Sequence, residues 1–137
     1  MPKIKRQTKE IYMEVGIKGK KTLVVTNELT AAALGSGNLD VYSTPSMIAL
    51  MENTAASSVA QFLEDGKTTV GTSVNIRHLR ATPVGMKVFA ESELVEVDRK
   101  RLVFNVCVYD ERELIGEGIH ERFIIDWESF MNKTNSK

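Results

Sequence analysis

The sequence predicts an α+β protein in which one long helix packs against a curved antiparallel sheet of about five strands. The stretch from residue 44 to about residue 63 is apolar on nearly every side, which is typical of a buried helix. After residue 66 the apolar period changes to two, and short turn sequences separate four long segments. Connections this short join antiparallel neighbours. One sheet can bury such a helix only by curling around it.

The first half of the chain contains a strand, an irregular segment and the helix. Residues 21–26 are rich in β-branched side chains and predict the first strand. Residues 27–42 form an irregular segment with a glycine-rich loop. We expect Thr44 to cap the helix, because Pro45 then occupies the first helical position, where its missing N–H costs nothing. Gly66 marks the end of the helical segment.

The second half of the chain predicts four long strands joined by tight turns. They span residues 69–79, 86–97, 101–109 and 114–125. One helical turn follows, and then a polar tail at residues 131–137. A chain of 137 residues is expected to form a single domain, residues 1–137. Within it, we expect residues 1–14 to be frayed or to form an N-terminal extension.

Composition and charge argue against several classes of partner. Eighteen basic residues balance eighteen acidic ones, so no net field attracts nucleic acid or an anionic membrane. No apolar segment follows the basic first ten residues, and none reaches the roughly 20 residues of a membrane span. Cys107 is the only cysteine, so no disulfide forms within the chain, and its place in a strand favours packing over nucleophilic chemistry. We expect a cytoplasmic protein.

Glu52 is a carboxylate within the otherwise apolar helix. Burying a carboxylate is costly unless it is paired, hydrogen-bonded or neutralised, and reactive chemistry is one reason to retain it. Glu52 would attack a carbonyl directly or activate water as a base, and the sequence leaves both open. The alternative is a glutamate that faces a polar gap at a subunit interface. More of the helix is apolar than one sheet covers, which predicts a homodimer or a higher assembly.

His78 and Thr44 are further candidates for the same site. His78 shares strand parity with Ile76 and Val74, so it should point toward the helix. There it would pair with Glu52 as a proton carrier, or it would be a satisfied core histidine. Eight residues separate Thr44 from Glu52, about 12 Å along a regular helix, so the two cannot hydrogen-bond directly. Either the helix begins after Thr44, or the two residues act from opposite subunits.

The last strand and one glycine are harder to interpret. Arg122 and His120 lie on the less apolar side of their strand, so we expect both to face solvent unless a bulge intervenes. Alternatively, Arg122 meets a ligand at a groove between two subunits. Gly71 lies inside a strand, where glycine indicates a bulge or the close approach of a ligand.

Three segments of the chain together resemble the hot-dog thioesterases, and more narrowly the fluoroacetyl-CoA thioesterase group. The segments are VYSTPSMIALME at residues 41–52, VGTSVNIRH at 70–78 with ATPVG at 81–85, and GEGIHER at 116–122. The resemblance implies a hot-dog fold, in which an antiparallel sheet wraps a long helix and two subunits form one continuous sheet. It also implies hydrolysis of an acyl-CoA thioester, with coenzyme A as part of the substrate and no separate cofactor.

The resemblance assigns roles to five residues. Thr44, Glu52 and His78 correspond to the catalytic residues of the group, with Thr44 positioning or polarising the substrate. Gly71 and Arg122 correspond to residues around the thioester.

The chain departs from the group between residues 29 and 40, where it is shorter and has no aromatic residue. A small or medium acyl group without selectivity for fluorine is therefore expected. The alternatives are a hot-dog hydratase or dehydratase that uses His78, and an acyl-CoA-binding module without activity.

Overall fold

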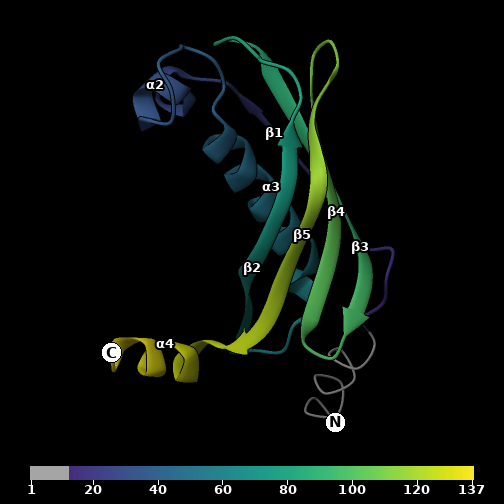
Figure 1. Ribbon diagram of the computed structural model, residues 1–137. Coiled ribbons are helices and arrows are strands. Elements are labelled where there is room, and N and C mark those ends of the chain that lie inside the picture. Colours follow the sequence, from purple (N-terminus) through teal and green to yellow (C-terminus); the bar gives the residue numbers. More distant parts are fainter. Residues whose placement is uncertain (1–12) are drawn as a thin grey trace.

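The computed structural model describes residues 13–137 and contains one five-stranded sheet and one long helix (Figure 1). The elements before the second strand are β1 (Lys18–Val24), the short helices η1 (Asn27–Leu29) and α2 (Ala31–Leu34), α3 (Thr44–Val59) and η2 (Ala60–Phe62). The remaining elements are β2 (Lys67–His78), β3 (Lys87–Asp98), β4 (Arg101–Asp110), β5 (Leu114–Asp126) and α4 (Trp127–Asn135). The expectation for residues 1–14 falls mostly outside the described residues, although Met13 is buried in the core.

The strands pair in the order β1-β3-β4-β5-β2, and every neighbouring pair is antiparallel. The sheet curves around α3, which crosses behind it in Figure 1. This arrangement confirms the predicted fold class, and the four long strands lie where the period of two placed them. The first strand begins three residues earlier than predicted, at Lys18. No helix in residues 13–137 is long and apolar enough to cross a membrane.

The core lies between α3 and the concave face of the sheet. From α3 it receives Met47, Leu50, Met51, Ala55 and Val59. The opposite side of the helix is open: Ala49 and Asn53 are exposed, and the Glu52 side chain retains 38% of its accessible surface. Residues 13–137 of one chain therefore do not bury Glu52 as fully as the sequence suggested.

The N-cap of α3 and the length of α4 differ from prediction. The N-cap of α3 is Ser43, whose hydroxyl accepts a hydrogen bond from the Ser46 amide at 3.1 Å, and Thr44 is the first helical residue. The cap prediction for Thr44 was wrong by one residue, because serine and threonine are both good caps and occur side by side. At the C-terminus, α4 extends to Asn135 and is longer than the predicted single turn.

The two faces of β5 are the reverse of those predicted. Ile119 and Phe123 are 46% and 41% exposed, whereas His120 and Arg122 are 1% and 8% exposed. The pairing of β2 with β5 shifts between Gly71 and Ser73, but this bulge lies in β2; β5 keeps its alternation, and His120 and Arg122 pair with the buried Phe104 and Leu102 of β4. The predictions that His120 and Arg122 face solvent were therefore wrong. The prediction failed because Ile119 and Phe123 are apolar although they lie on the outer face of the sheet.

Candidate active site

The first part of the candidate site is a contact between the start of α3 and the end of β2. The hydroxyl of Thr44 and Nδ1 of His78 are joined by a hydrogen bond of 2.7 Å. Because Ser43 caps the helix, the Thr44 side chain is free to make this contact. The pair borders a cleft of about 330 Å³, whose lining residues are Ala31, Ser36, Val41, Tyr42, Ser43, Thr44, His78, Leu79, Arg80 and Ala81.

His78 points toward the helix, as its parity predicted. Burial lowers the pKa of His78, and the backbone of Arg80 opposes this shift. A lowered pKa favours the neutral imidazole, which accepts a proton at one nitrogen and carries one at the other. Nε2 is buried and makes no hydrogen bond of acceptable geometry with any described residue of its own chain. Which nitrogen of His78 carries the proton depends on the tautomer, and Nε2 has no hydrogen-bond partner of good geometry among residues 13–137.

The second part of the candidate site surrounds Glu52, two helical turns further along α3. Oε2 of Glu52 lies 3.7 Å from Nη1 of Arg122. Arg122 also donates from Nε to the Thr69 hydroxyl at 2.8 Å and from Nη2 to the Thr69 carbonyl at 2.9 Å. Burial lowers the pKa of Arg122, and Glu52 partly restores it. An ordinary arginine pKa is so high that the guanidinium stays charged at neutral pH.

Gly71 leaves room for this ion pair. A Cβ at position 71 would lie 2.6 Å from Oε2 of Glu52 and 3.2 Å from Nη1 of Arg122. The absence of a side chain at Gly71 is therefore what lets the carboxylate lie against the strand. The register shift between Gly71 and Ser73 confirms the bulge that this glycine predicted, and the approach of a ligand stays a prediction.

Within one chain, the two parts of the site remain separate. Thr44 and His78 meet at one end of α3, and Glu52, Gly71 and Arg122 meet near its middle. Among residues 13–137, Glu52 and His78 form no ion pair with each other, so the predicted Glu52–His78 pair does not form within a single chain. The distance along the helix explains why: eight residues correspond to about 12 Å.

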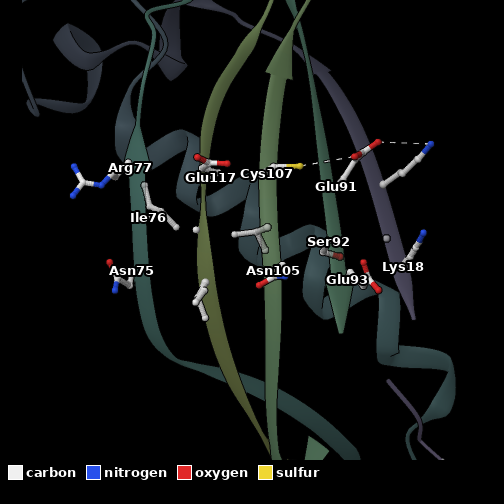
Figure 2. A pocket seen from close by; sticks show the side chains of 15 residues that line it. Lys18, Asn75, Ile76, Arg77, Glu91, Ser92, Glu93, Asn105, Cys107 and Glu117 are labelled. Atoms are coloured by element: carbon white, nitrogen blue, oxygen red, sulfur yellow. Dashed lines mark hydrogen bonds and ion pairs between the residues drawn. The ribbon is translucent and has the colours of Figure 1, made fainter. Parts of the chain in front are cut away.

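A hollow larger than the cleft beside Thr44 and His78 lies on the outer face of the sheet (Figure 2). It measures about 740 Å³ and is bordered by side chains such as Glu91, Cys107 and Glu117, while α3 passes behind the strands. None of the five predicted site residues lines it. Burial, followed by the charge of Glu91, raises the pKa of Cys107, which disfavours the reactive thiolate. In residues 13–137, no three His, Cys, Asp or Glu side chains cluster as metal ligands would.

Sequence reasoning missed His120. Its ring nitrogens contact the Ser73 carbonyl at 2.8 Å and Nη1 of Arg122 at 3.1 Å, so it belongs to the Glu52 part of the site. The signal that could have revealed it lies in β4, where residues 102, 104, 106 and 108 are all apolar; His120 pairs with Phe104, and directly paired residues point to the same face.

A family model described as fluoroacetyl-CoA-specific thioesterase matches residues 25–128. The fluoroacetyl-CoA thioesterase of Streptantibioticus cattleyicolor is 37% identical over 98 residues, which are 72% of this chain and 70% of that protein. A solved structure of the fluoroacetyl-CoA thioesterase FlK superimposes with a TM-score of 0.86 at 33% identity, covering 91% of this chain and 97% of that one.

A hypothetical protein of Thermus thermophilus, described as a thioesterase superfamily member, superimposes with a TM-score of 0.84 at 28% identity, covering 90% of this chain and 92% of its own. The family model spans most of the chain, including Thr44, Glu52, Gly71, His78 and Arg122. The chain belongs to the family of fluoroacetyl-CoA-specific thioesterases.

Proposed function

We propose that this protein is an acyl-CoA thioesterase that hydrolyses a small or medium acyl-CoA to the free acid and coenzyme A. The observation that carries the proposal is the 2.7 Å contact between Thr44 and His78 at the edge of a cleft. Membership of the thioesterase family supports the class of reaction.

The proposed reaction uses Glu52, His78 and Thr44. As a base, Glu52 takes a proton from water while the water oxygen bonds to the thioester carbonyl carbon. The C–S bond then breaks, and His78 carries the proton to the departing thiolate. As a nucleophile, Glu52 bonds to the carbonyl carbon itself, expels the thiolate and leaves a mixed anhydride for water to hydrolyse. In both routes the Thr44 hydroxyl positions the substrate or polarises its carbonyl oxygen. Coenzyme A is part of the substrate, and the proposal includes no separate cofactor.

A homodimer that joins the two parts of the site belongs to the same proposal. β2 lies at an edge of the sheet, so one side of this 12-residue strand is unpaired in the chain. An antiparallel pair of β2 strands centred on Asn75, with the bulge between Gly71 and Ser73 taken into account, sets Gly71 opposite the partner's His78. In that register the Glu52 part of one subunit meets the Thr44–His78 part of the other, and Nε2 of His78 gains a partner. The exposed apolar residues of α4, which extends beyond β2 in Figure 1, are available to the same partner.

The proposed substrate has an ordinary acyl group without fluorine. The cleft beside Thr44 and His78 is lined on the side of residues 30–40 by Ala31 and Ser36, and that segment has no aromatic side chain. Small side chains leave space for an acyl group but make no specific contact with fluorine. A cytoplasmic location is part of the proposal, supported by a single cysteine that has no disulfide partner in the chain.

A thiol-release assay over a panel of acyl-CoA thioesters tests the proposal. We expect thiol release with small or medium acyl groups, and kcat/KM values for acetyl-CoA and fluoroacetyl-CoA that differ by less than about tenfold, or about 1.4 kcal/mol. Saturable binding without thiol release across the whole panel would instead indicate an acyl-CoA-binding module. Hydration of an enoyl-CoA without thiol release would indicate a hydratase.

A further inference from the structure

His120 is buried on the inward face of β5 and both of its ring nitrogens are occupied. Its ring stacks on Phe104 with centroids 6.3 Å apart and an angle of 28° between the planes. Nδ1 lies 2.8 Å from the Ser73 carbonyl oxygen, and Nε2 lies 3.1 Å from Nη1 of Arg122. Only 1% of the residue is exposed. The imidazole is therefore hydrogen-bonded to the backbone of β2 through Nδ1 and to the Arg122 guanidinium through Nε2.

The chemistry of the two partners fixes the protonation of the ring. A carbonyl oxygen only accepts hydrogen bonds, so Nδ1 carries the proton and donates to Ser73. A guanidinium only donates, so Nε2 keeps its lone pair and accepts from Arg122. Burial lowers the pKa of His120, the Ser73 carbonyl opposes this, the charge of Arg122 lowers the pKa further, and Glu52 and Glu121 raise it. The net lowering agrees with a neutral ring of one tautomer.

The Arg122 guanidinium is held on three sides. Thr69 accepts two of its hydrogen bonds, through its hydroxyl and its carbonyl, and His120 accepts the third. Nη1 also faces Glu52, whose Oε2 lies 3.7 Å away. Thr69 fixes one edge of the guanidinium plane, and His120 fixes the nitrogen that faces the carboxylate. Without an acceptor at Nε2, Nη1 would be free to move relative to Glu52.

We propose that His120 is a positioning residue, whose neutral Nε2 holds Nη1 of Arg122 against Glu52. This inference rests on the proposed function, because it matters for turnover only if Glu52 reacts. Displacing a catalytic group by about 1 Å costs on the order of 100-fold in rate, so losing this acceptor should lower kcat roughly 10- to 100-fold. The effect on KM should be small, because His120 lies behind Arg122 and does not line the cleft beside Thr44.

Two amide substitutions separate the two hydrogen bonds of His120. In His120→Asn, the shorter amide replaces the Nδ1 donor to Ser73 but has no acceptor at the place of Nε2. In His120→Gln, the longer amide can place its oxygen where Nε2 accepted from Arg122. We expect His120→Gln to keep kcat within roughly threefold of wild type, and His120→Asn to lose roughly 10- to 100-fold with little change in KM. A residue that only supports the strand would give the opposite order.

A third variant and a control complete the design. His120→Phe keeps a ring against Phe104 and has no acceptor, so it should lose as much kcat as His120→Asn. Ile119→Ala, on the outward face of the same strand, is the control and should retain wild-type kcat. Thermal unfolding followed by circular dichroism checks that each variant folds. If His120→Phe does not fold, the Asn and Gln pair still decides. Wild-type kcat in His120→Asn would overturn the inference.

Glu52→Gln distinguishes a failure of the inference from a failure of the proposed function. If Glu52→Gln retains wild-type turnover, the proposed chemistry is wrong and His120 has nothing to position. If Glu52→Gln is inactive while His120→Asn and a folded His120→Phe turn over normally, the proposed function stands and only the positioning role is wrong.

Discussion

Glu52 and Arg122 form an ion pair between a partly exposed carboxylate and a buried cation. The Glu52 side chain is 38% exposed and that of Arg122 only 10%, with 3.7 Å between their nearest charged atoms. An ion pair at this distance, with a carboxylate that water reaches, contributes little to stability because water screens it. The arginine has Thr69 and His120 as further acceptors and does not depend on the carboxylate for its place. The arrangement therefore fits a carboxylate that is positioned for chemistry.

Gly71→Ala should reduce turnover while leaving the fold intact. The new Cβ would lie 2.6 Å from Oε2 of Glu52, the mobile end of a side chain, so the carboxylate would move and the backbone would not. We expect kcat to fall by roughly 100-fold, as for a catalytic group displaced by about 1 Å. Steady-state kinetics together with the melting temperature check this. Unchanged kcat in a folded Gly71→Ala would show that the carboxylate does not react from the position seen here.

At the scale of elements, the start of α3 divides two tasks between neighbouring residues. Ser43 is 1% exposed and caps the helix, so the adjacent Thr44 can turn its hydroxyl to His78 at the end of β2. Pro45 lies in the first turn, where a missing amide hydrogen costs nothing. The helix terminus and the strand end thus converge on one cleft, and because Ser43 provides the cap, the Thr44 hydroxyl is available to His78.

Ser43→Ala and Thr44→Val should separate stability from activity. Loss of the cap costs about 1 kcal/mol of the unfolding free energy, so Ser43→Ala should be less stable with nearly normal kcat. Thr44→Val keeps the side-chain shape and removes the hydroxyl, so it should lose roughly 100-fold in kcat, comparable to the loss of one polarising donor. Urea unfolding and thiol release measure the two effects. A stable Thr44→Val with normal kcat would leave the Thr44–His78 contact without a catalytic role.

At the scale of the whole molecule, β2 is the edge on which the proposed assembly depends. Residues 71–75 of this strand are exposed in the chain, and an unpaired edge of 12 residues readily pairs with another strand. Pairing of two copies would extend the sheet across both subunits and bring the two parts of the site together.

Mixing two inactive variants tests that assembly directly. Glu52→Ala and His78→Ala should each fold as a dimer without turnover, because each lacks one part of every site. Random exchange of subunits in a two-fold dimer makes half of the dimers mixed, each with one complete site, so activity should return to about one quarter of wild type. Light scattering should give twice the 15.3 kDa chain mass. A monomeric mass, or no recovery after verified subunit exchange, would contradict a site shared between subunits.

The sequence by itself determined the α+β class, because a long apolar helix followed by segments of period two has few ways to bury its surface. It also singled out Glu52, because a carboxylate is costly inside an apolar helix. Both features depend on local pattern, and the family resemblance added Thr44, Gly71, His78 and Arg122.

Only the tertiary structure decided which way β5 faces and which residues meet. His120 and Arg122 face inward because they pair with Phe104 and Leu102 of β4, which lie in the core, and the pattern of β5 alone does not show this pairing. The Thr44–His78 contact and the distance of both from Glu52 likewise arise from segments far apart in the chain. Period and propensity act between near neighbours, whereas register and contact are set when distant strands pair.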